Sequence, residues 1–159
     1  MWYNTAMFHI VLVEPEIPQN TGNISRTCAV TGAALHLVHP LGFSLDEKHL
    51  RRAGLDYWKD LTLYEHESFA AVEAAYPQAR FFLATTHAAR SYAQVSYRDG
   101  DFLVFGRETA GLGQAILSRR ADDGIRIPMG RDQRSLNLSN AVAVVLYEAL
   151  RQNGFPGLQ

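Results

Sequence analysis

The segment Ile125-Arg-Ile-Pro-Met129 is followed by a polar loop and then by Ser135-Leu-Asn-Leu-Ser-Asn140, and its pattern is the most informative in the chain. Beyond Asn137, apolar residues recur every three or four positions, at Leu138, Ala141, Val142, Val145, Leu146, Ala149 and Leu150. This spacing is typical of a helix with one buried face, and it predicts a helix over residues 137–152. We therefore expect a loop held between a short strand over residues 125–127 and this helix.

The start of that helix is unusually polar. Ser135, Asn137, Ser139 and Asn140 supply more hydroxyls and amides than a helix start needs, because a single side-chain oxygen satisfies the N-cap. The surplus indicates a bound ligand. The alternative is a well-capped helix whose polar neighbours are solvated.

Working outward, short apolar runs alternate with helical patterns along the chain. Strands are expected over residues 8–13, 34–38, 81–84, 102–105 and 125–127, and helices over residues 21–31, 46–52, 68–75, 114–119 and 137–152. Gly32 and Gly54 are the expected ends of the first two helices. The alternation predicts an α/β fold with a mostly parallel sheet flanked by helices.

Length and composition fit one domain over residues 1–159, since 159 residues with 47% hydrophobic content can bury a core. Residues 1–6 are expected to be a dispensable extension, and translation could start at Met7 because a strand follows it directly. The longest apolar run covers only residues 141–147, which excludes a transmembrane span of roughly 20 residues. With no export leader at the start, we expect a soluble cytoplasmic protein.

The single cysteine and the net charge exclude little else. Cys28 has no partner for a disulfide and lies within a helical pattern, so we expect a buried structural thiol. The net charge of −1 gives no overall sign of nucleic-acid binding, although a local basic face remains compatible with it. Six histidines show no metal-ligand spacing, so no metal site is expected.

A first cluster of candidate site residues follows the first strand, in Glu14-Pro-Glu-Ile-Pro-Gln-Asn-Thr-Gly-Asn-Ile-Ser-Arg26. Asn20, Thr21 and Asn23 lie near a helix N-terminus, where backbone N–H groups favour anions, and Arg26 follows within the first turns. A phosphate or sugar could bind there, although neither G-x-G-x-x-G nor a P-loop is present. The alternative is a capped helix with a solvated arginine.

A second cluster is the glycine-rich turn after the strand at residues 102–105. Gly106 would let a ligand pack on bare backbone, and Glu108 could orient a substrate or cap the next helix. Ligands of open α/β sheets bind beyond the carboxyl ends of strands, where this turn lies. An ordinary turn with an exposed Glu108 is the alternative.

A third cluster is Ile127-Pro-Met129, an apolar wall that suits an adenine or a thioether, followed by Arg131 and Arg134. Elsewhere, cations and aromatic side chains gather in a mixture that suits RNA, or else forms a solvated helix face. These residues are Lys48, Arg51, Arg52, Tyr57 and Trp58.

Together the clusters resemble the three motifs of the SPOUT class of RNA methyltransferases, in order and over nearly the whole chain. The motifs are Asn20-Thr-Gly-Asn-Ile-Ser-Arg26, Phe105-Gly-Arg-Glu-Thr-Ala-Gly-Leu112, and Ile125-Arg-Ile-Pro-Met129 with Ser135-Leu-Asn-Leu-Ser-Asn140. The 2′-O-ribose branch fits best. Glu14-Pro-Glu-Ile-Pro18 and Leu50-Arg-Arg-Ala-Gly-Leu-Asp-Tyr57 resemble its members that methylate the tRNA wobble nucleotide, in the anticodon stem-loop. The resemblance implies a homodimer, S-adenosylmethionine as cofactor without metal, and a C-terminal trefoil knot.

The resemblance also implies roles for particular residues. The cofactor residues would be Ala84, Thr85, Gly106, Ile127, Met129, Ser135, Leu136 and Leu138, although Ala84 stands where the family has a bulkier leucine. The candidate catalytic residues are Arg26, Asn23, Glu108, Ser135, Asn137 and Tyr147. The candidate RNA-binding residues are Arg51, Arg52, Arg131 and Arg134.

The reaction implied is methyl transfer from the sulfonium to the 2′ oxygen of a cytidine or modified uridine. Because a guanidinium stays protonated, Arg26 would position the hydroxyl or its phosphate and stabilise negative charge, which leaves the general base unassigned. One rival is a 2′-O-methyltransferase for another tRNA or rRNA nucleotide, and another is a catalytically silent RNA-binding module of the same fold. An NAD-binding domain is disfavoured because its glycine fingerprint is missing.

Overall fold

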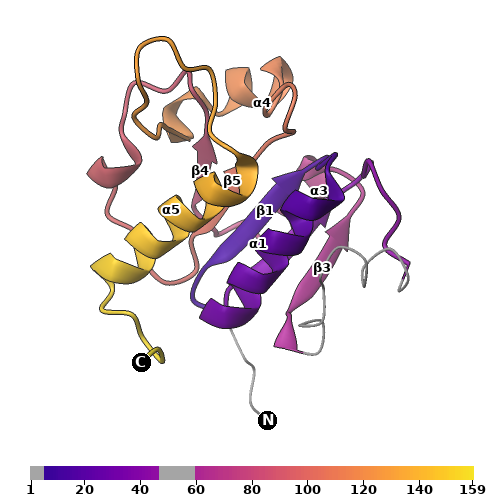
Figure 1. Cartoon of the computed structure of the whole chain (residues 1–159), viewed down its shortest axis with the longest axis vertical. Coiled ribbons are helices and arrows are strands. Elements are labelled where there is room, and N and C mark those ends of the chain that lie inside the picture. The colour runs from indigo at the N-terminus through magenta and orange to yellow at the C-terminus, as the bar shows by residue number, and fades with distance from the viewer. Residues whose placement is uncertain (1–5, 47–59) are drawn as a thin grey trace.

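The computed structural model describes residues 6–46 and 60–159, and six parallel strands form one sheet in that part of the chain (Figure 1). The strands are β1 (His9–Val13), β2 (Ala34–Val38), β3 (Leu63–His66), β4 (Phe81–Ala84), β5 (Phe102–Phe105) and β6 (Gly124–Ile125). Their order across the sheet is β3-β2-β1-β5-β4-β6. The helices are α1 (Pro18–Thr31), α3 (Phe69–Ala75), α4 (Gln114–Arg119) and α5 (Leu138–Gln152), with short 3-10 turns η2 (Tyr92–Gln94) and η3 (Ala121–Asp123).

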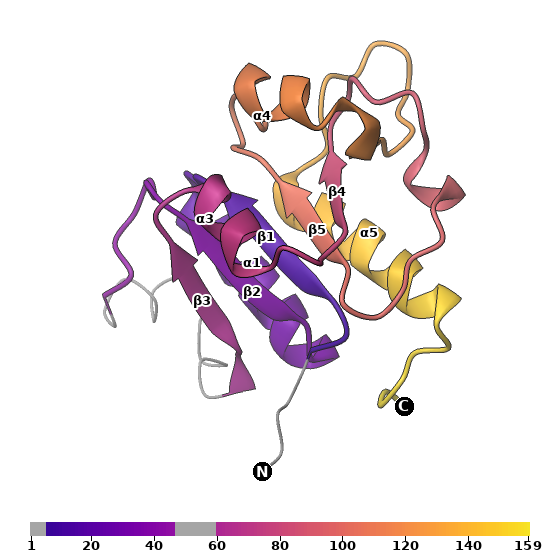
Figure 2. The ribbon, with the colours of Figure 1, turned by 180° about the vertical axis from the view of Figure 1, so that it is seen from behind.

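Helices cover both faces of the sheet. Helices α1 and α5 lie side by side on one face, and α3 and α4 lie on the other (Figures 1 and 2). Strand β5 shows how the sequence produces these layers, because its four residues are all apolar and all buried. Leu103 and Phe105 pack toward α1 and α5, whereas Phe102 and Val104 pack toward α3 and α4. The predicted parallel α/β sheet is therefore confirmed.

The observed elements correct several expected boundaries. Strand β3 was not predicted, because Leu63–His66 is partly exposed at the edge of the sheet and contains no apolar run. Helix α1 begins at Pro18, three residues earlier than predicted, with proline in the first turn, where its missing N–H is not needed. Strand β6 ends at Ile125, so residues 126 and 127 belong to the following loop. Residues 47–52 of the expected helix 46–52, and Gly54 with them, lie outside the described residues.

The predicted end of α1 and the predicted start of α5 are confirmed. Helix α1 ends at Gly32, which adopts φ +79° and donates its N–H to the Cys28 carbonyl at 2.9 Å. Ser68 caps α3, and Asn137 caps α5. Cys28 is buried, as predicted, and burial raises the pKa of its thiol. Over residues 6–46 and 60–159, no helix combines the length and apolar character that crossing a membrane requires.

A row of three histidines crosses the sheet on the face covered by α3. His9 Nδ1 lies 2.9 Å from His36 Nε2, and His36 Nδ1 lies 2.9 Å from His66 Nε2. His36 is fully buried, and burial lowers its pKa from 6.5 to about 3 and that of His9 from 6.5 to about 4. Both rings are therefore neutral at pH 7. In each of the two contacts, the N–H of one ring donates to the bare nitrogen of the next ring.

Candidate functional site

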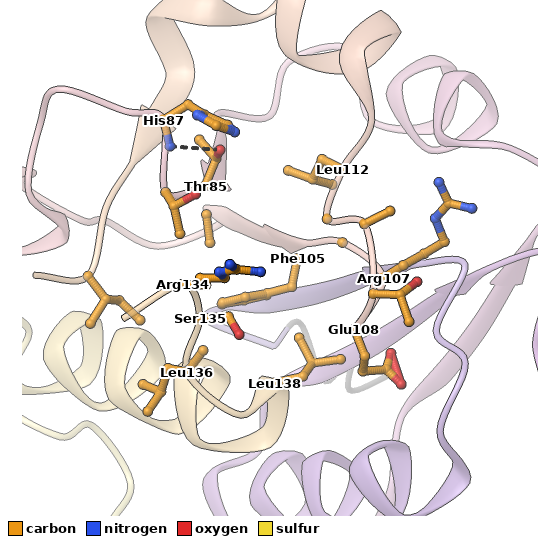
Figure 3. A pocket seen from close by; sticks show the side chains of 18 of the residues that line it. Thr85, His87, Phe105, Arg107, Glu108, Leu112, Arg134, Ser135, Leu136 and Leu138 are labelled. Carbon is orange, nitrogen blue, oxygen red and sulfur yellow. Dashed lines mark hydrogen bonds between the residues drawn. The ribbon is translucent and has the colours of Figure 1, made fainter. Parts of the chain in front are cut away.

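A cavity of about 620 Å³ lies beyond the carboxyl ends of β4 and β5 (Figure 3). Three segments far apart in the sequence supply most of its lining: the residues after β4, the loop after β5 and the loop between β6 and α5. Ile17 and Asn20, at the start of α1, line it as well. Parallel strands bring these segments to one edge of the sheet, because their carboxyl ends all point the same way. The volume is that of a site for a cofactor-sized organic molecule.

The walls of the cavity combine apolar side chains with hydroxyl and backbone groups. The apolar part includes Leu112, Leu117, Ile127, Met129, Leu136 and Leu138. Thr85 and Ser135 supply hydroxyls, and in the close view Ser135, Leu136 and Leu138 lie across the cavity from Thr85 and Leu112 (Figure 3). An apolar surface with a few polar groups suits a flat heterocycle with a polar tail.

Gly106 lines the cavity, but the space that its missing side chain leaves is filled by the loop after β5. A Cβ on Gly106 would lie 2.1 Å from the carbonyl carbon of Gly111 and 2.3 Å from the Leu112 nitrogen. The turn is held by two backbone hydrogen bonds between Arg107 and Gly111, at 3.0 and 2.9 Å. The expected contact of a ligand with bare backbone at Gly106 is thus corrected in part, because the missing side chain makes room for the chain itself.

Glu108 caps helix α1, although the two lie on different loops. Its carboxylate accepts hydrogen bonds from the Glu16 N–H, at 3.1 and 3.2 Å to its two oxygens, and from the Ile17 N–H. Ile17 is the N-cap residue of α1 and offers no side-chain cap of its own. These two donors near the α1 N-terminus, where we expected a phosphate or sugar, are therefore bound to the protein's own carboxylate. Glu108 caps a helix, as one of its predicted roles had it, but that helix is α1 rather than the next one in the chain.

Asn137 joins the starts of the two helices on the α1 and α5 face. Its Oδ1 accepts from the backbone N–H groups of Ser139 and Asn140, at 3.0 and 3.3 Å, and from the Ser139 hydroxyl. Its Nδ2 donates to Asn20 Oδ1 at 3.1 Å. The surplus of polar groups at the helix start is thus partly used within the protein. Asn20 is buried and lines the cavity, and no pattern in the sequence identified it as the partner of Asn137.

The structure gathers most of the predicted site residues at the cavity. All the predicted cofactor residues line it, namely Ala84, Thr85, Gly106, Ile127, Met129, Ser135, Leu136 and Leu138. The predicted catalytic residues Glu108, Ser135 and Asn137 line it too, and so does Arg134. Their functions remain predictions.

The other predicted residues lie elsewhere. Arg26 and Asn23 are exposed on α1, and Tyr147 is exposed on α5, and none of the three lines the cavity of its own chain. Arg131 is exposed on the loop before α5 and also lies outside the lining. Arg51 and Arg52 lie outside the described residues.

Sequence reasoning missed several lining residues. Thr86, His87 and Leu117 line the cavity but lie outside the three motifs, and Arg107 and Thr109 lie within the second motif but had no predicted role. Periodicity carries no signal for them, since each comes from a loop or a short helix. Over residues 6–46 and 60–159, His, Cys, Asp and Glu side chains nowhere gather in a group of three able to hold a metal ion.

Comparisons with known proteins agree with this geometry. A sequence model of the SpoU rRNA Methylase family matches residues 7–147. The tRNA (cytidine(34)-2′-O)-methyltransferase of Escherichia coli (strain K12) is 55% identical over 153 residues, covering 95% of this chain and 97% of the relative. The enzyme of the same name from Polaromonas sp. (strain JS666) is 53% identical over 154 residues, covering 95% of this chain and 94% of its own.

Solved structures share the fold. One described as "Structural insights into the 2-OH methylation of C/U34 on tRNA" has a TM-score of 0.87 and 47% identity, covering 94% of this chain and 97% of its own. The SpoU methyltransferase AviRb of Streptomyces viridochromogenes, solved with the cofactor AdoMet, has a TM-score of 0.81 and 26% identity. That comparison covers 94% of this chain and 58% of AviRb. The matches in sequence and in fold show that the chain belongs to the SpoU rRNA methylase family.

Proposed function

We propose that this chain transfers a methyl group from S-adenosylmethionine to the ribose 2′-hydroxyl of nucleotide 34, the wobble nucleotide, in the anticodon stem-loop of tRNA. The observation that carries the proposal is that all the predicted cofactor residues meet in one cavity, on a chain half identical to relatives named for this activity. In that transfer the methyl carbon would exchange its bond to sulfur for a bond to the 2′ oxygen, the hydroxyl proton would pass to solvent water, and S-adenosylhomocysteine would be the leaving group.

The cavity has the chemistry that the cofactor needs. Ile127, Met129 and Leu138 offer an apolar surface for the adenine, and Thr85 and Ser135 offer hydroxyls for the polar groups. When bound, S-adenosylmethionine supplies an electrophilic methyl group, so the protein itself has to orient and deprotonate the attacking hydroxyl. This chemistry needs no metal ion, because the sulfonium already carries the positive charge that activates the methyl group.

The residues of this chain would contribute mainly by placement. Holding two reactants in line lowers the barrier by several kcal/mol, which a rigid site achieves better than a mobile one. Glu108 and Asn137 are already held at the cavity by hydrogen bonds, and Ser135 lines the cavity beside them. Arg26 would orient the hydroxyl or its phosphate and stabilise the developing charge, since it does not lose its proton.

A homodimer gives Arg26, Asn23 and Tyr147 access to a cavity. These residues lie outside the cavity of their own chain, on helices α1 and α5, which cover the same face of the sheet. Val30 on α1 and Tyr147 on α5 are also 58% and 42% exposed, although both are large and apolar in character. We infer that two copies pack through this face, so that one chain brings these residues to the cavity of its partner.

The tRNA would be held partly by cations around the cavity. Arg134 lines the cavity and Arg131 is exposed three residues before it, while Arg51 and Arg52 remain candidates from the sequence. In a dimer each of these four arginines is present twice, which gives a protein whose chains each carry a net charge of −1 a local basic surface. Affinity for tRNA should then fall steeply with added salt, and a flat response would contradict these contacts.

The proposal also covers a C-terminal knot, the domain bounds and the location of the protein. We propose that the C-terminal part forms a trefoil knot, which is supported by the pairing of β6 with β4 and by the shared cavity of the loops after β5 and β6. A single domain over residues 1–159, with a dispensable extension at residues 1–6, remains part of the proposal. A tRNA substrate and a buried lone thiol at Cys28 fit a cytoplasmic location.

The test is transfer of labelled methyl from S-adenosylmethionine to tRNA that lacks the modification, with the product nucleotide mapped. Wild type should label nucleotide 34, Arg26→Ala should lose most of the activity, and Arg98→Ala should keep it. Arg98 is a matched control because it is exposed before β5, at the opposite end of the sheet from the cavity. Label at another nucleotide would support the rival substrate, and cofactor binding without transfer to any RNA would support the silent module.

Mixing tests the dimer directly. A mixture of Arg26→Ala and Gly106→Ala chains should regain part of the activity that each lacks alone, because a mixed dimer contains one intact arginine beside one intact cavity. No recovery, with mixed dimers shown to form, would overturn this arrangement.

A further inference from the structure

Two glutamates on different loops each accept backbone hydrogen bonds from the opposite loop. Glu108 accepts from the N–H groups of Glu16 and Ile17, as described above. In return, Glu16 Oε1 accepts from the Thr109 N–H at 3.1 Å and from the Thr109 hydroxyl at 2.7 Å. These hydrogen bonds lower the pKa of the Glu16 carboxyl below its usual value, so both the charge and the contact persist at neutral pH.

We call this arrangement the glutamate clamp, meaning Glu16, Ile17, Glu108 and Thr109. It joins the loop after β1 to the loop after β5, and these two strands are neighbours in the sheet. Each carboxylate accepts its hydrogen bonds from donors on the opposite loop, so neither half is satisfied without the other.

The two loops carry different parts of the proposed reaction. The loop after β5 forms a wall of the cavity, including Gly106, Glu108 and Thr109. The loop after β1 leads into α1, which carries the predicted catalytic residues Asn23 and Arg26. The clamp is thus a direct polar link between the loop after β5, which we call the cofactor wall, and the start of the helix that carries Arg26.

The loop after β1 is also held on the side away from Glu108. On that side, Gly42 packs so tightly that a Cβ there would lie 2.6 Å from the Glu16 carbonyl oxygen. The Gly42 N–H also donates to the Pro15 carbonyl at 2.9 Å. The backbone at Glu16 is therefore held between Gly42 and Glu108. The Glu16 side chain in turn holds Thr109 in place through two hydrogen bonds.

We propose that Glu16 is a positioning residue for methyl transfer, which couples the cofactor wall to the placement of α1 through Thr109. Glu16 does not line the cavity and touches neither cofactor nor RNA in this account, so it acts through the residues that do. The inference rests on the proposed function, since it assigns α1 a part in the reaction.

The test compares Glu16→Ala with Glu16→Gln. Both Thr109 hydrogen bonds fall on one oxygen, Oε1, so the glutamine amide oxygen can accept both. Glu16→Ala should lower kcat for methyl transfer at least tenfold while the Kd for S-adenosylmethionine changes less than threefold, because small displacements of catalytic groups are costly. Glu16→Gln should stay within threefold of wild type in both quantities.

Two controls separate positioning from stability. Gly32→Ala lowers stability at the far end of α1, and its kcat well below its melting temperature should equal that of wild type. Thr109→Val, which removes only the hydroxyl donor, should lower kcat in the same direction as Glu16→Ala but by less. Wild-type kcat in Glu16→Ala, or a glutamine variant as impaired as the alanine variant, would overturn the proposal.

Amide hydrogen exchange measures whether the hydrogen bonds of the clamp are present, and it does not depend on activity. In Glu16→Ala, the amides of Ile17 and Thr109 should exchange at least tenfold faster than in wild type, and Glu16→Gln should restore their protection. If wild type transfers no methyl to tRNA, the proposed function fails while exchange still reports the clamp. Unchanged exchange in Glu16→Ala would overturn the inference about Glu16 and would leave the proposed function intact.

Discussion

The substitution Gly106→Ala tests how the cavity wall is built. The added Cβ would lie 2.1 Å from the Gly111 carbonyl carbon and 2.3 Å from the Leu112 nitrogen, whereas ordinary contact begins at 3.4 Å. The turn that follows β5 therefore has to move by about 1 Å, which costs roughly 1–3 kcal/mol of stability as overpacking.

Because that turn lines the cavity, the movement should also damage function. A displacement of about 1 Å in a catalytic site lowers the rate by about 100-fold, so we expect a kcat/KM near one hundredth of the wild-type value. The Kd for S-adenosylmethionine should rise at least tenfold. Titration calorimetry gives the Kd, and steady-state transfer of labelled methyl to tRNA gives kcat/KM.

Gly32→Ala is the matched control for loss of stability. Gly32 adopts φ +79° with no other atom within 4 Å of the added Cβ, so alanine there costs about 1 kcal/mol through backbone strain and leaves the cavity intact. Its Kd and kcat/KM should match those of wild type. The reasoning fails if Gly106→Ala binds the cofactor and transfers methyl as well as wild type does.

Three further predictions concern stability. The lowered pKa values of His9 and His36 mean that only the unfolded chain takes up these protons below pH 6.5, so stability should be steady above pH 6.5 and fall as the pH drops toward 4. The loss should be about 2 kcal/mol per histidine at pH 5, and equal urea unfolding free energies at pH 7 and pH 5 would contradict it. Asp101→Ala should cost about 2 kcal/mol in urea unfolding, since the buried carboxylate holds Arg80 at 2.6 and 2.8 Å; a loss below 0.5 kcal/mol would refute this. Asn137→Ala should cost about 1–2 kcal/mol by removing the cap of α5 and the bond to α1, and an unchanged melting temperature would speak against both contacts.

Much of the fold could be predicted because its signals are local. The helical spacing after Asn137 predicts α5 and its cap, and apolar runs predict β2, β4 and β5 with their observed bounds. The motif positions assigned to the cofactor meet in one cavity, since parallel strands bring their carboxyl ends together.

The remaining features depend on contacts between distant segments. Nothing near Glu108 indicates that its partners are Glu16 and Ile17, about ninety residues earlier in the chain. The bond between Asn20 and Asn137 spans 117 residues and carries no periodic signal. Strand β3 forms at an exposed edge by backbone pairing with β2, so its side chains need not be apolar.

Methylation of the ribose 2′ oxygen of nucleotide 34 can be tested with two anticodon stem-loops that differ by one oxygen atom. One carries cytidine at position 34, and the other carries 2′-deoxycytidine there with every other ribose unchanged. The account predicts that the wild-type protein labels the first with one methyl group at nucleotide 34 and does not label the second. Equal labelling of both would contradict it, because the methyl group would then be going to another atom.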